Sequence, residues 1–363
     1  MSQSPGPDFG QPAKPELFHG LQLLRAVAAI SVAVYHWAIA WFPEAYRTNA
    51  FDRVVSVGSA GVDLFFVISG FVIYTSTSGE PSRTTAGTFF LRRFRRIYPL
   101  YWILLAVIVA ARLAGFSTQI LAGAEVELTP WSLIQNILLF PTEYPVLGVA
   151  WTLSFEIYFY AIFGLLLFIR RPIARAVALA AMITAITVVA RLVPQNNLSF
   201  FFQDSVVFEF LLGVLIAAAF ERYRGTKWPT AWWIAPMVAV LFLSPWFVAY
   251  DWDEGLEPRL LWMGLPCAVI VAASLGIRFQ PGRLRDTVLL LGDASYAIYL
   301  VHTFFILAYV RFLRAVPLDL PLQIGLGVVG LIVSCLAGVA VHILVERPLR
   351  GLFRRQSALA PAG

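Results

Sequence analysis

One apolar run of this chain carries an arginine and a histidine. Arg25 and His36 lie in "LQLLRAVAAISVAVYHWAIAWF", residues 21–42. An α-helix turns about 100° per residue, so both side chains would lie on nearly one face, roughly 16 Å apart. Insertion of each ionisable group near the centre of a membrane helix costs roughly 2.5–3.5 kcal/mol of free energy. The pair therefore predicts a polar cavity along this helix, unless Arg25 reaches the membrane interface and His36 caps a buried carbonyl.

Other ionisable side chains also fall within long apolar runs, and such groups usually mark a substrate or proton path. They are Asp63 in "GVDLFFVISGF", Glu156 in "WTLSFEIYFY", Glu209 in "FEFLLG" and His302 in "GDASYAIYLVHT". Histidine is the commonest general base, and a neighbouring carboxylate can hold its tautomer. We predict that His36 is a catalytic base and that Asp63 is its partner, because the short connection 43–56 makes their two runs neighbours. Glu156 is the alternative partner, and Asp63 could instead pair with an arginine.

A basic cluster precedes the third apolar run, in "FLRRFRRIYPLYW", residues 90–102. Its four arginines are Arg92, Arg93, Arg95 and Arg96, and Tyr98 follows them. The guanidinium fork suits phosphate groups. Such a cluster also fits the excess of positive charge on the cytoplasmic side of membrane proteins and contact with anionic lipids. Four arginines with no acid among them are more than topology requires, so we expect some of them to bind an anionic ligand.

The composition is that of a membrane protein. Of 363 residues, 59% are hydrophobic and only 13% are charged, against about a quarter in soluble domains. We expect a flexible cytoplasmic tail at 1–20, a membrane-embedded domain at 21–350 and a cytoplasmic tail at 351–363. Cys267 and Cys335 lie in apolar runs, which disfavours a disulfide framework, and no metal-binding spacing or phosphate loop is present.

The elements that must position these groups are helices, so the expected fold class is an all-α polytopic bundle embedded in the lipid bilayer. The lysines and arginines concentrate in alternate loops and in both tails, which places both termini in the cytoplasm. The net charge of +6 is thus a topology signal, and we expect no nucleic-acid partner. A short apolar stretch, 131–140, is expected to lie at the interface. The ten expected spans are 21–42, 57–78, 97–114, 148–169, 172–193, 199–220, 231–250, 259–277, 288–313 and 322–345.

Six sequence blocks, in this order, resemble those of the acyltransferase type 3 family of integral membrane acyltransferases. They are "LRAVAAISVAVYHW", "GVDLFFVISGFVIY", "FLRRFRRIYPLYW", "WTLSFEIYFY", "GDASYAIYLVHT" and "VERPLR". The resemblance implies transfer of an acyl group, usually acetyl, from cytoplasmic acetyl-CoA to hydroxyls. The implied acceptors are sugars of surface polysaccharides, lipopolysaccharide or peptidoglycan, or small glycosylated metabolites. It also implies a multi-pass protein of the cell (inner) membrane.

The resemblance assigns roles to individual residues. The family's arginine and histidine correspond to Arg25 and His36, and its fourth-span carboxylate corresponds to Glu156. Its basic motif corresponds to the cluster already described, of which we favour Arg93 and Arg96 as acyl-CoA ligands, together with Arg92 and Tyr98. The ninth span supplies the residues expected to bind the acceptor: Ser295, Tyr296, Tyr299 and His302.

A non-enzymatic transporter or flippase of a glycan or small molecule is the alternative, because it would also use ionisable groups at mid-depth. Neither reading fixes the acceptor, the length of the acyl chain or the oligomeric state. They also leave open whether His36 acts as a base or carries the acyl group covalently.

Overall fold

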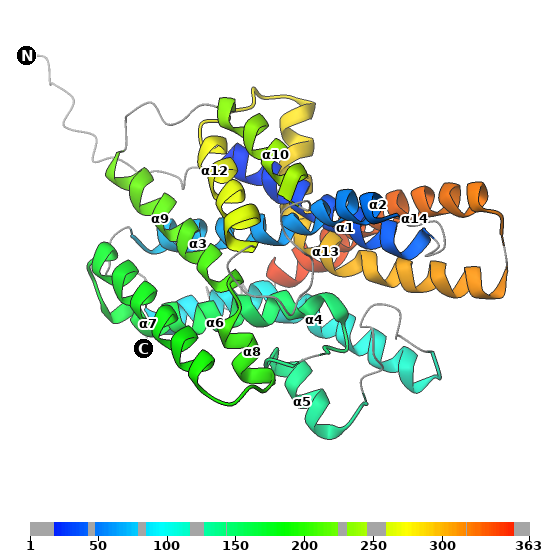
Figure 1. Ribbon diagram of the computed structural model, residues 1–363, viewed down its shortest axis with the longest axis horizontal. Coiled ribbons are helices and arrows are strands. Elements are labelled where there is room, and N and C mark those ends of the chain that lie inside the picture. Colours follow the sequence, from blue (N-terminus) through cyan, green and yellow to red (C-terminus); the bar gives the residue numbers. More distant parts are fainter. Residues whose placement is uncertain are drawn as a thin grey trace, which may run out of the picture.

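The described part of the chain is built from helices. The computed structural model describes residues 18–42, 48–78, 85–116, 127–142, 144–223, 231–244, 259–316 and 318–351 (Figure 1). No strand occurs among them, which confirms the all-α prediction. The expected tails at 1–20 and 351–363 lie almost wholly outside these residues. The α-helices are α1 His19–Trp41, α2 Asn49–Ser56, α3 Ala60–Ser78, α4 Ala86–Leu113, α5 Pro130–Leu138, α6 Trp151–Leu165, α7 Pro172–Leu192, α8 Asn197–Gln203, α9 Val206–Arg222, α10 Ile234–Leu243, α12 Leu265–Ser274, α13 Arg283–Ala315 and α14 Leu320–Val341.

Eight helical segments of the described residues are long and apolar enough to cross a membrane, so the chain is an integral multi-pass membrane protein. They coincide with eight of the expected spans. The other two, 231–250 and 259–277, contain shorter apolar helices, Ile234–Leu243 and Leu260–Ser274. At about 1.5 Å per residue these helices rise about 15 Å and about 22 Å, so each is shorter than the hydrocarbon core of about 30 Å. The residues between these two helices, 245–258, lie outside the described part of the chain.

The basic cluster lies within a helix and not ahead of one. We expected the third span to begin at 97, but α4 begins at Ala86, where the Thr85 hydroxyl caps it by accepting from the Thr88 N–H at 3.2 Å. This threonine cap is a favourable start for a helix, and it extends α4 by about three turns. The arginines therefore project from successive turns of a continuous helix.

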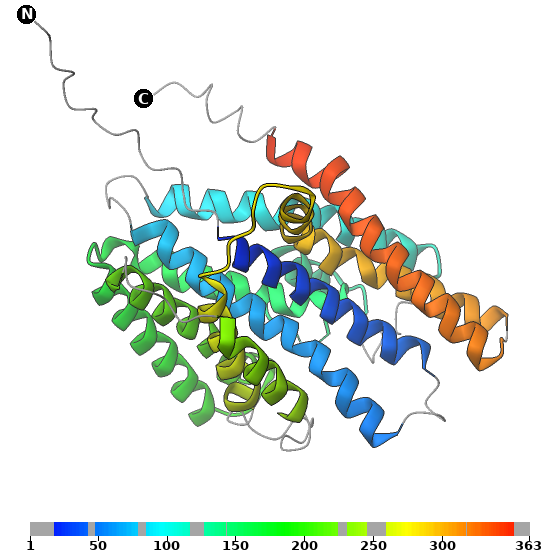
Figure 2. The same cartoon turned by 90° about the horizontal axis from the view of Figure 1, so that it is seen from above.

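Helix α1 lies between α3 on one side and the pair α13 and α14 on the other (Figure 2). Glycine allows the closest approach between α1 and α13. A Cβ atom at Gly292 would lie 2.5 Å from the Gln22 carbonyl oxygen, which is shorter than any normal contact. Small residues commonly permit such approaches between membrane helices. The backbone of α13 is therefore held directly against the first turns of α1.

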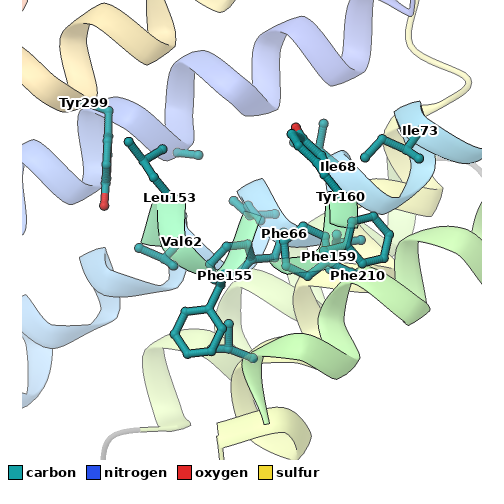
Figure 3. Packing of buried hydrophobic residues seen from close by; sticks show 14 of the residues in the cluster. Val62, Phe66, Ile68, Ile73, Leu153, Phe155, Phe159, Tyr160, Phe210 and Tyr299 are labelled. Atoms are coloured by element: carbon teal, nitrogen blue, oxygen red, sulfur yellow. The ribbon is translucent and has the colours of Figure 1, made fainter. Parts of the chain in front are cut away.

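The contact between α3 and α9 follows the same rule and carries an aromatic core. A Cβ atom at Gly213 would lie 2.0 Å from the Val67 carbonyl oxygen. Phe66, Phe159 and Phe210 pack beside this contact, and the rings of Phe159 and Phe210 stack at 4.3 Å (Figure 3). Helices α3, α6 and α9 thus share one aromatic core.

Candidate active site

The Arg25 side chain connects α1 to α13. Its guanidinium donates to the Ser295 hydroxyl at 3.1 Å and to the Gln22 side-chain oxygen at 3.1 Å. The Gln22 amide in turn donates to the Asp293 carboxylate at 3.0 Å. Since Asp293 and Ser295 belong to the "GDAS" segment beside Gly292, the close helix contact also fixes the position of Arg25. This network holds the Arg25 side chain against α13.

Arg25 lines a cavity between α1, α3, α4, α6 and α13, which we call the arginine cavity. It contains three guanidinium groups, from Arg25, Arg93 and Arg96, and the carboxylate of Glu156 is the one acidic group in its lining. The excess of positive charge suits an anionic ligand, because guanidinium forms strong bidentate bonds with phosphate. The other polar lining residues are Ser69, Thr152, Tyr160, Ser295, Tyr296 and Tyr299.

The two cavity-facing arginines of α4 differ in how they are held. The Arg93 guanidinium packs against the Phe89 and Tyr160 rings, 5.4 Å from each centroid, and contacts the Ser76 hydroxyl at 3.4 Å. Arg96 makes no hydrogen bond to any residue that the structure describes, although Glu156 and Glu346 lie close enough to interact with its charge. Its donors are therefore available to a ligand in the cavity.

Two residues expected to bind acyl-CoA, Arg92 and Tyr98, do not line this cavity. Arg92 is exposed, and its Nε atom donates to the Thr88 carbonyl of its own helix at 3.2 Å. The Tyr98 hydroxyl donates to the Leu138 carbonyl at 2.9 Å and so ties α4 to α5. Arg93 and Arg96, three residues apart on one face of α4, line the cavity, whereas the Arg92 side chain is exposed. The expected role of Arg92 and Tyr98 as acyl-CoA ligands stays a prediction.

Glu156 lies in the arginine cavity and not beside His36. It accepts hydrogen bonds from the Tyr160 hydroxyl and, at 3.3 Å, from the Ser69 hydroxyl. Its charge also faces Arg93 and Arg96. Glu156 is therefore placed to orient groups within the arginine cavity, which differs from the expected role as the partner of His36.

A second cavity, of about 400 Å³, opens beside His36, and we call it the histidine cavity. Val62 and Tyr299 line both cavities, so these two side chains form the boundary between them. Figure 3 shows Val62, Leu153 and Tyr299 near one another at this place. One continuous polar cavity was predicted from the spacing of Arg25 and His36, whereas α1 borders two cavities, of which the one beside His36 is lined mostly by apolar and aromatic side chains. The residues that line the histidine cavity are Val32, Tyr35, His36, Ile39, Ala40, Ser59, Val62, Trp151, Tyr299 and Val310.

Two tyrosines of α13 are fixed by hydrogen bonds to backbone. The Tyr299 hydroxyl donates to the Val149 carbonyl at 2.9 Å and lies 2.9 Å from the Thr152 hydroxyl. The Tyr296 hydroxyl donates to the Ile97 carbonyl at 2.8 Å. Ser295, Tyr296 and Tyr299, expected to bind the acceptor, thus lie in the arginine cavity, and Tyr299 alone of the three also reaches the histidine cavity.

The side chain in contact with His36 is His302, not a carboxylate. The His36 Nδ1 atom lies 3.1 Å from His302 Nε2, and the two rings stack with centroids 5.2 Å apart. His302 is fully buried and lines neither cavity, so it does not contact an acceptor there. The arrangement therefore joins two imidazoles, one facing the histidine cavity and one behind it.

Asp63 has a different partner from the one expected. Its carboxylate accepts two hydrogen bonds from the Arg259 guanidinium, at 3.1 and 2.8 Å, and is fully buried. Asp63 lines neither cavity, and the structure does not bring it to His36. Glu209 is buried beside this pair, and neither of its carboxylate oxygens has a hydrogen-bond partner among the described residues. The alternative considered for Asp63, a pair with an arginine, is the one observed.

Sequence reasoning missed Arg259, Tyr35 and Trp151. Arg259 begins an apolar run directly after an acidic loop, and this position was a usable sign of an arginine with a buried partner. Trp151 and Tyr35 add aromatic surface to the histidine cavity. Tyr35 directly precedes His36 in the chain, but no periodic pattern distinguished it from the surrounding apolar residues.

Comparison with known proteins shows the family of the chain. The family model described as an acyltransferase domain, that of acyltransferase type 3, matches residues 18–341. This chain belongs to the acyltransferase type 3 family. The family resemblance drawn from the six sequence blocks is thereby confirmed.

Individual members of the family are moderately similar to the chain. The exopolysaccharide production protein ExoZ of Rhizobium meliloti is 32% identical over 84% of this chain and 93% of its own length. Acyltransferase MdmB of Streptomyces mycarofaciens is 29% identical over 93% of both chains. The O-acetyltransferase OatA of Staphylococcus aureus is 21% identical over 93% of this chain and 58% of its own length. No solved structure matches the chain significantly.

Proposed function

We propose that this family member moves an acetyl or other short acyl group from cytoplasmic acyl-CoA to a hydroxyl of a carbohydrate of the cell envelope. The observation that carries the proposal is the pair of cavities that meet at Val62 and Tyr299, one rich in arginine and the other lined by a histidine. The names of two relatives, an exopolysaccharide production protein and an O-acetyltransferase, support a glycan hydroxyl as the acceptor.

The arginine cavity is the proposed acyl-CoA site. The phosphate groups of CoA suit Arg25, Arg93 and Arg96, because the lining holds these three guanidinium groups and one carboxylate, that of Glu156. In the proposed orientation this end of α1 faces the cytoplasm, where acyl-CoA is present, since the basic loops lie on that side. The thin pantetheine arm would then extend toward Tyr299 and bring the thioester to the boundary of the two cavities.

The histidine cavity is the proposed acceptor site, and His36 is the proposed base. His36 takes the proton of the acceptor hydroxyl while the hydroxyl oxygen forms a bond to the thioester carbonyl carbon. The carbon–sulfur bond then breaks, and the CoA sulfur receives the proton. The aromatic side chains of Tyr35 and Trp151 supply flat apolar surface for a sugar ring beside His36.

Release of free CoA thiol from acetyl-CoA tests this proposal, with the purified protein in detergent and a panel of polysaccharide acceptors. General-base catalysis contributes about 10²- to 10⁴-fold, so His36→Ala should lose that much turnover. His36→Gln should do no better, because an amide cannot accept the proton usefully. Binding of acetyl-CoA should survive in both variants, since the proposed phosphate ligands lie in the other cavity.

His19→Gln is the matched control, because His19 begins the same helix but lies outside both cavities. Its Nδ1 atom accepts from the Phe279 N–H at 2.9 Å, a structural contact. The control should turn over at the wild-type rate. A folded His36→Ala protein with turnover within a few-fold of wild type would refute the assignment of His36. A wild-type protein that transports a glycan without releasing thiol would favour the transporter.

A further inference from the structure

The contact between His302 and His36 defines which ring nitrogen of each histidine carries a proton. The Nδ1 atom of His302 lies 3.2 Å from the Ile298 carbonyl oxygen. A carbonyl oxygen can only accept, so this Nδ1 must carry the hydrogen. A neutral imidazole has a single N–H group, which leaves His302 Nε2 as an acceptor.

The tautomer of His302 in turn determines the tautomer of His36. Its Nδ1 atom lies 3.1 Å from the accepting His302 Nε2, so His36 Nδ1 carries the hydrogen. The lone pair of His36 is therefore on Nε2, the nitrogen that does not contact His302. A protonated His302 would donate from both ring nitrogens. Neutral His36 would then accept at Nδ1 and carry its hydrogen on Nε2, which would have no free lone pair. The arrangement thus requires a neutral His302, which agrees with complete burial of that side chain.

We propose that His302 is a positioning residue that holds His36 in the tautomer with a free Nε2 lone pair. His302 does so in the place that a carboxylate occupies in a catalytic triad. This inference rests on the proposed function, in which His36 is the base. It explains how His36 is oriented although the two expected carboxylates have other partners, Arg259 for Asp63 and Tyr160 for Glu156. The expected role of His302 in binding the acceptor is replaced by this one.

The backbone of α13 restricts the movement of the His302 ring. Ile298, whose carbonyl accepts from His302, lies one turn earlier in the same helix, and both side chains are fully buried. A Cβ atom at Gly338 of α14 would lie 2.5 Å from the Ile298 Cα atom, so α14 packs tightly behind this turn. The ring of His302 therefore has little freedom to release the nitrogen of His36.

Two substitutions separate this role from simple packing. In His302→Gln the amide oxygen can accept the Nδ1 hydrogen of His36, as Nε2 of the native imidazole does. In His302→Leu the volume is similar but no acceptor remains. We expect the glutamine variant to keep turnover within about 10-fold of wild type, and the leucine variant to lose roughly 10²-fold or more, approaching His36→Ala. Acetyl-CoA affinity and the KM for the acceptor should stay the same, so the loss should appear in kcat.

A spectroscopic measurement tests the proposal independently of turnover. The chain has four histidines, so nitrogen NMR of ¹⁵N-histidine-labelled protein is tractable, with His→Gln variants used for assignment. The wild type should show His36 protonated at Nδ1 and bare at Nε2, and His302→Leu should lose this preference. A wild-type His36 protonated at Nε2, or a His302→Leu protein with wild-type kcat, would overturn the proposal. Absence of any acyl transfer by the wild type would refute the proposed function, while the tautomer measurement would still decide whether His302 sets the state of His36.

Discussion

Arg92, Arg93 and Arg96 belong to the same turns of α4 but have different surroundings, and this difference allows a sharp test. Arg93→Ala and Arg96→Ala should each weaken CoA binding by about 1.5–3 kcal/mol, roughly 10- to 150-fold, because each removes charged hydrogen bonds to phosphate. Arg96→Lys should restore only part of this, since lysine lacks the guanidinium fork. Titration of CoA into the purified variants by calorimetry gives the affinities.

Arg92→Ala is the matched control for the same measurement. It removes the same charge from the same helix, but its side chain is exposed and lies outside the cavity. Its CoA affinity should stay within about threefold of wild type, because exposed charges are screened over about 10 Å. Equal losses in all three alanine variants would mean that the cluster acts only through its total charge.

The buried pair of Asp63 and Arg259 should contribute to the free energy of unfolding. Removal of one partner of a buried ion pair typically costs about 3–5 kcal/mol, because the other charge is left without compensation. Asp63→Asn should therefore lower the thermal unfolding midpoint clearly, whereas His36→Ala should leave it unchanged. The double variant Asp63→Leu with Arg259→Leu should recover much of the loss. An Asp63→Asn protein that melts normally but has lost turnover would point back to a catalytic Asp63.

The sequence predicted several of the residues that line the two cavities but not their contacts. Helical spacing was sufficient to place Arg25 and His36 on one face, and the spacing of three residues favoured Arg93 and Arg96. The partner of His36 could not be predicted, because Asp63, Glu156 and His302 all lie within apolar runs and the short connection 43–56 favoured Asp63 only indirectly. Which of them meets His36 depends on how α13 is rotated against α1, and that rotation is set by close contacts such as the one at Gly292.

At the level of the helices, the closeness of α1 and α13 should be sensitive to a single methyl group. Gly292→Ala would place a Cβ atom 2.5 Å from the Gln22 carbonyl and 2.6 Å from its side-chain oxygen. Overpacking of this kind costs about 1–3 kcal/mol, so the unfolding midpoint should fall. CoA affinity should fall as well, because Gln22 helps to hold Arg25.

Gly325→Ala on α14 provides the control, since a Cβ atom there has nothing within 4 Å. It should melt at or slightly above the wild-type temperature, because alanine favours a helix over glycine by about 1 kcal/mol. Identical behaviour of the two variants, measured by thermal unfolding in detergent, would contradict the close contact between α1 and α13.

The helices were largely predictable from the lengths of the apolar runs. The differences between the expected and the observed helix bounds have physical causes. The eight long spans follow from runs of apolar residues that match the bilayer thickness. The early start of α4 was missed because its first turns are polar and basic, and hydropathy does not register a threonine cap. Helix α5, Pro130–Leu138, is as short as the stretch 131–140 predicted.

For the whole molecule, the distribution of basic residues predicts that both termini are cytoplasmic. Reporter fusions placed after Asp253 and at the C-terminus should therefore report opposite sides of the membrane. Alkaline phosphatase is active outside the cytoplasm and a fluorescent protein is active within it, so each fusion site can be read with both. The same side for both sites would refute the topology and would also remove the proposed cytoplasmic access of acyl-CoA to the arginine cavity.

The boundary formed by Val62 and Tyr299 has an electrical consequence. In the proposed orientation the two cavities enter the membrane from opposite faces, so most of the membrane voltage would fall across the boundary that divides them. A membrane voltage does work of about 2.3 kcal/mol per elementary charge per 100 mV. An aromatic ring and a branched aliphatic side chain provide a dry, poorly polarisable partition at this place. If the acyl group crosses this boundary as proposed, the opening that admits it must stay narrower than a hydrated ion, since a wider one would let ions leak across the membrane.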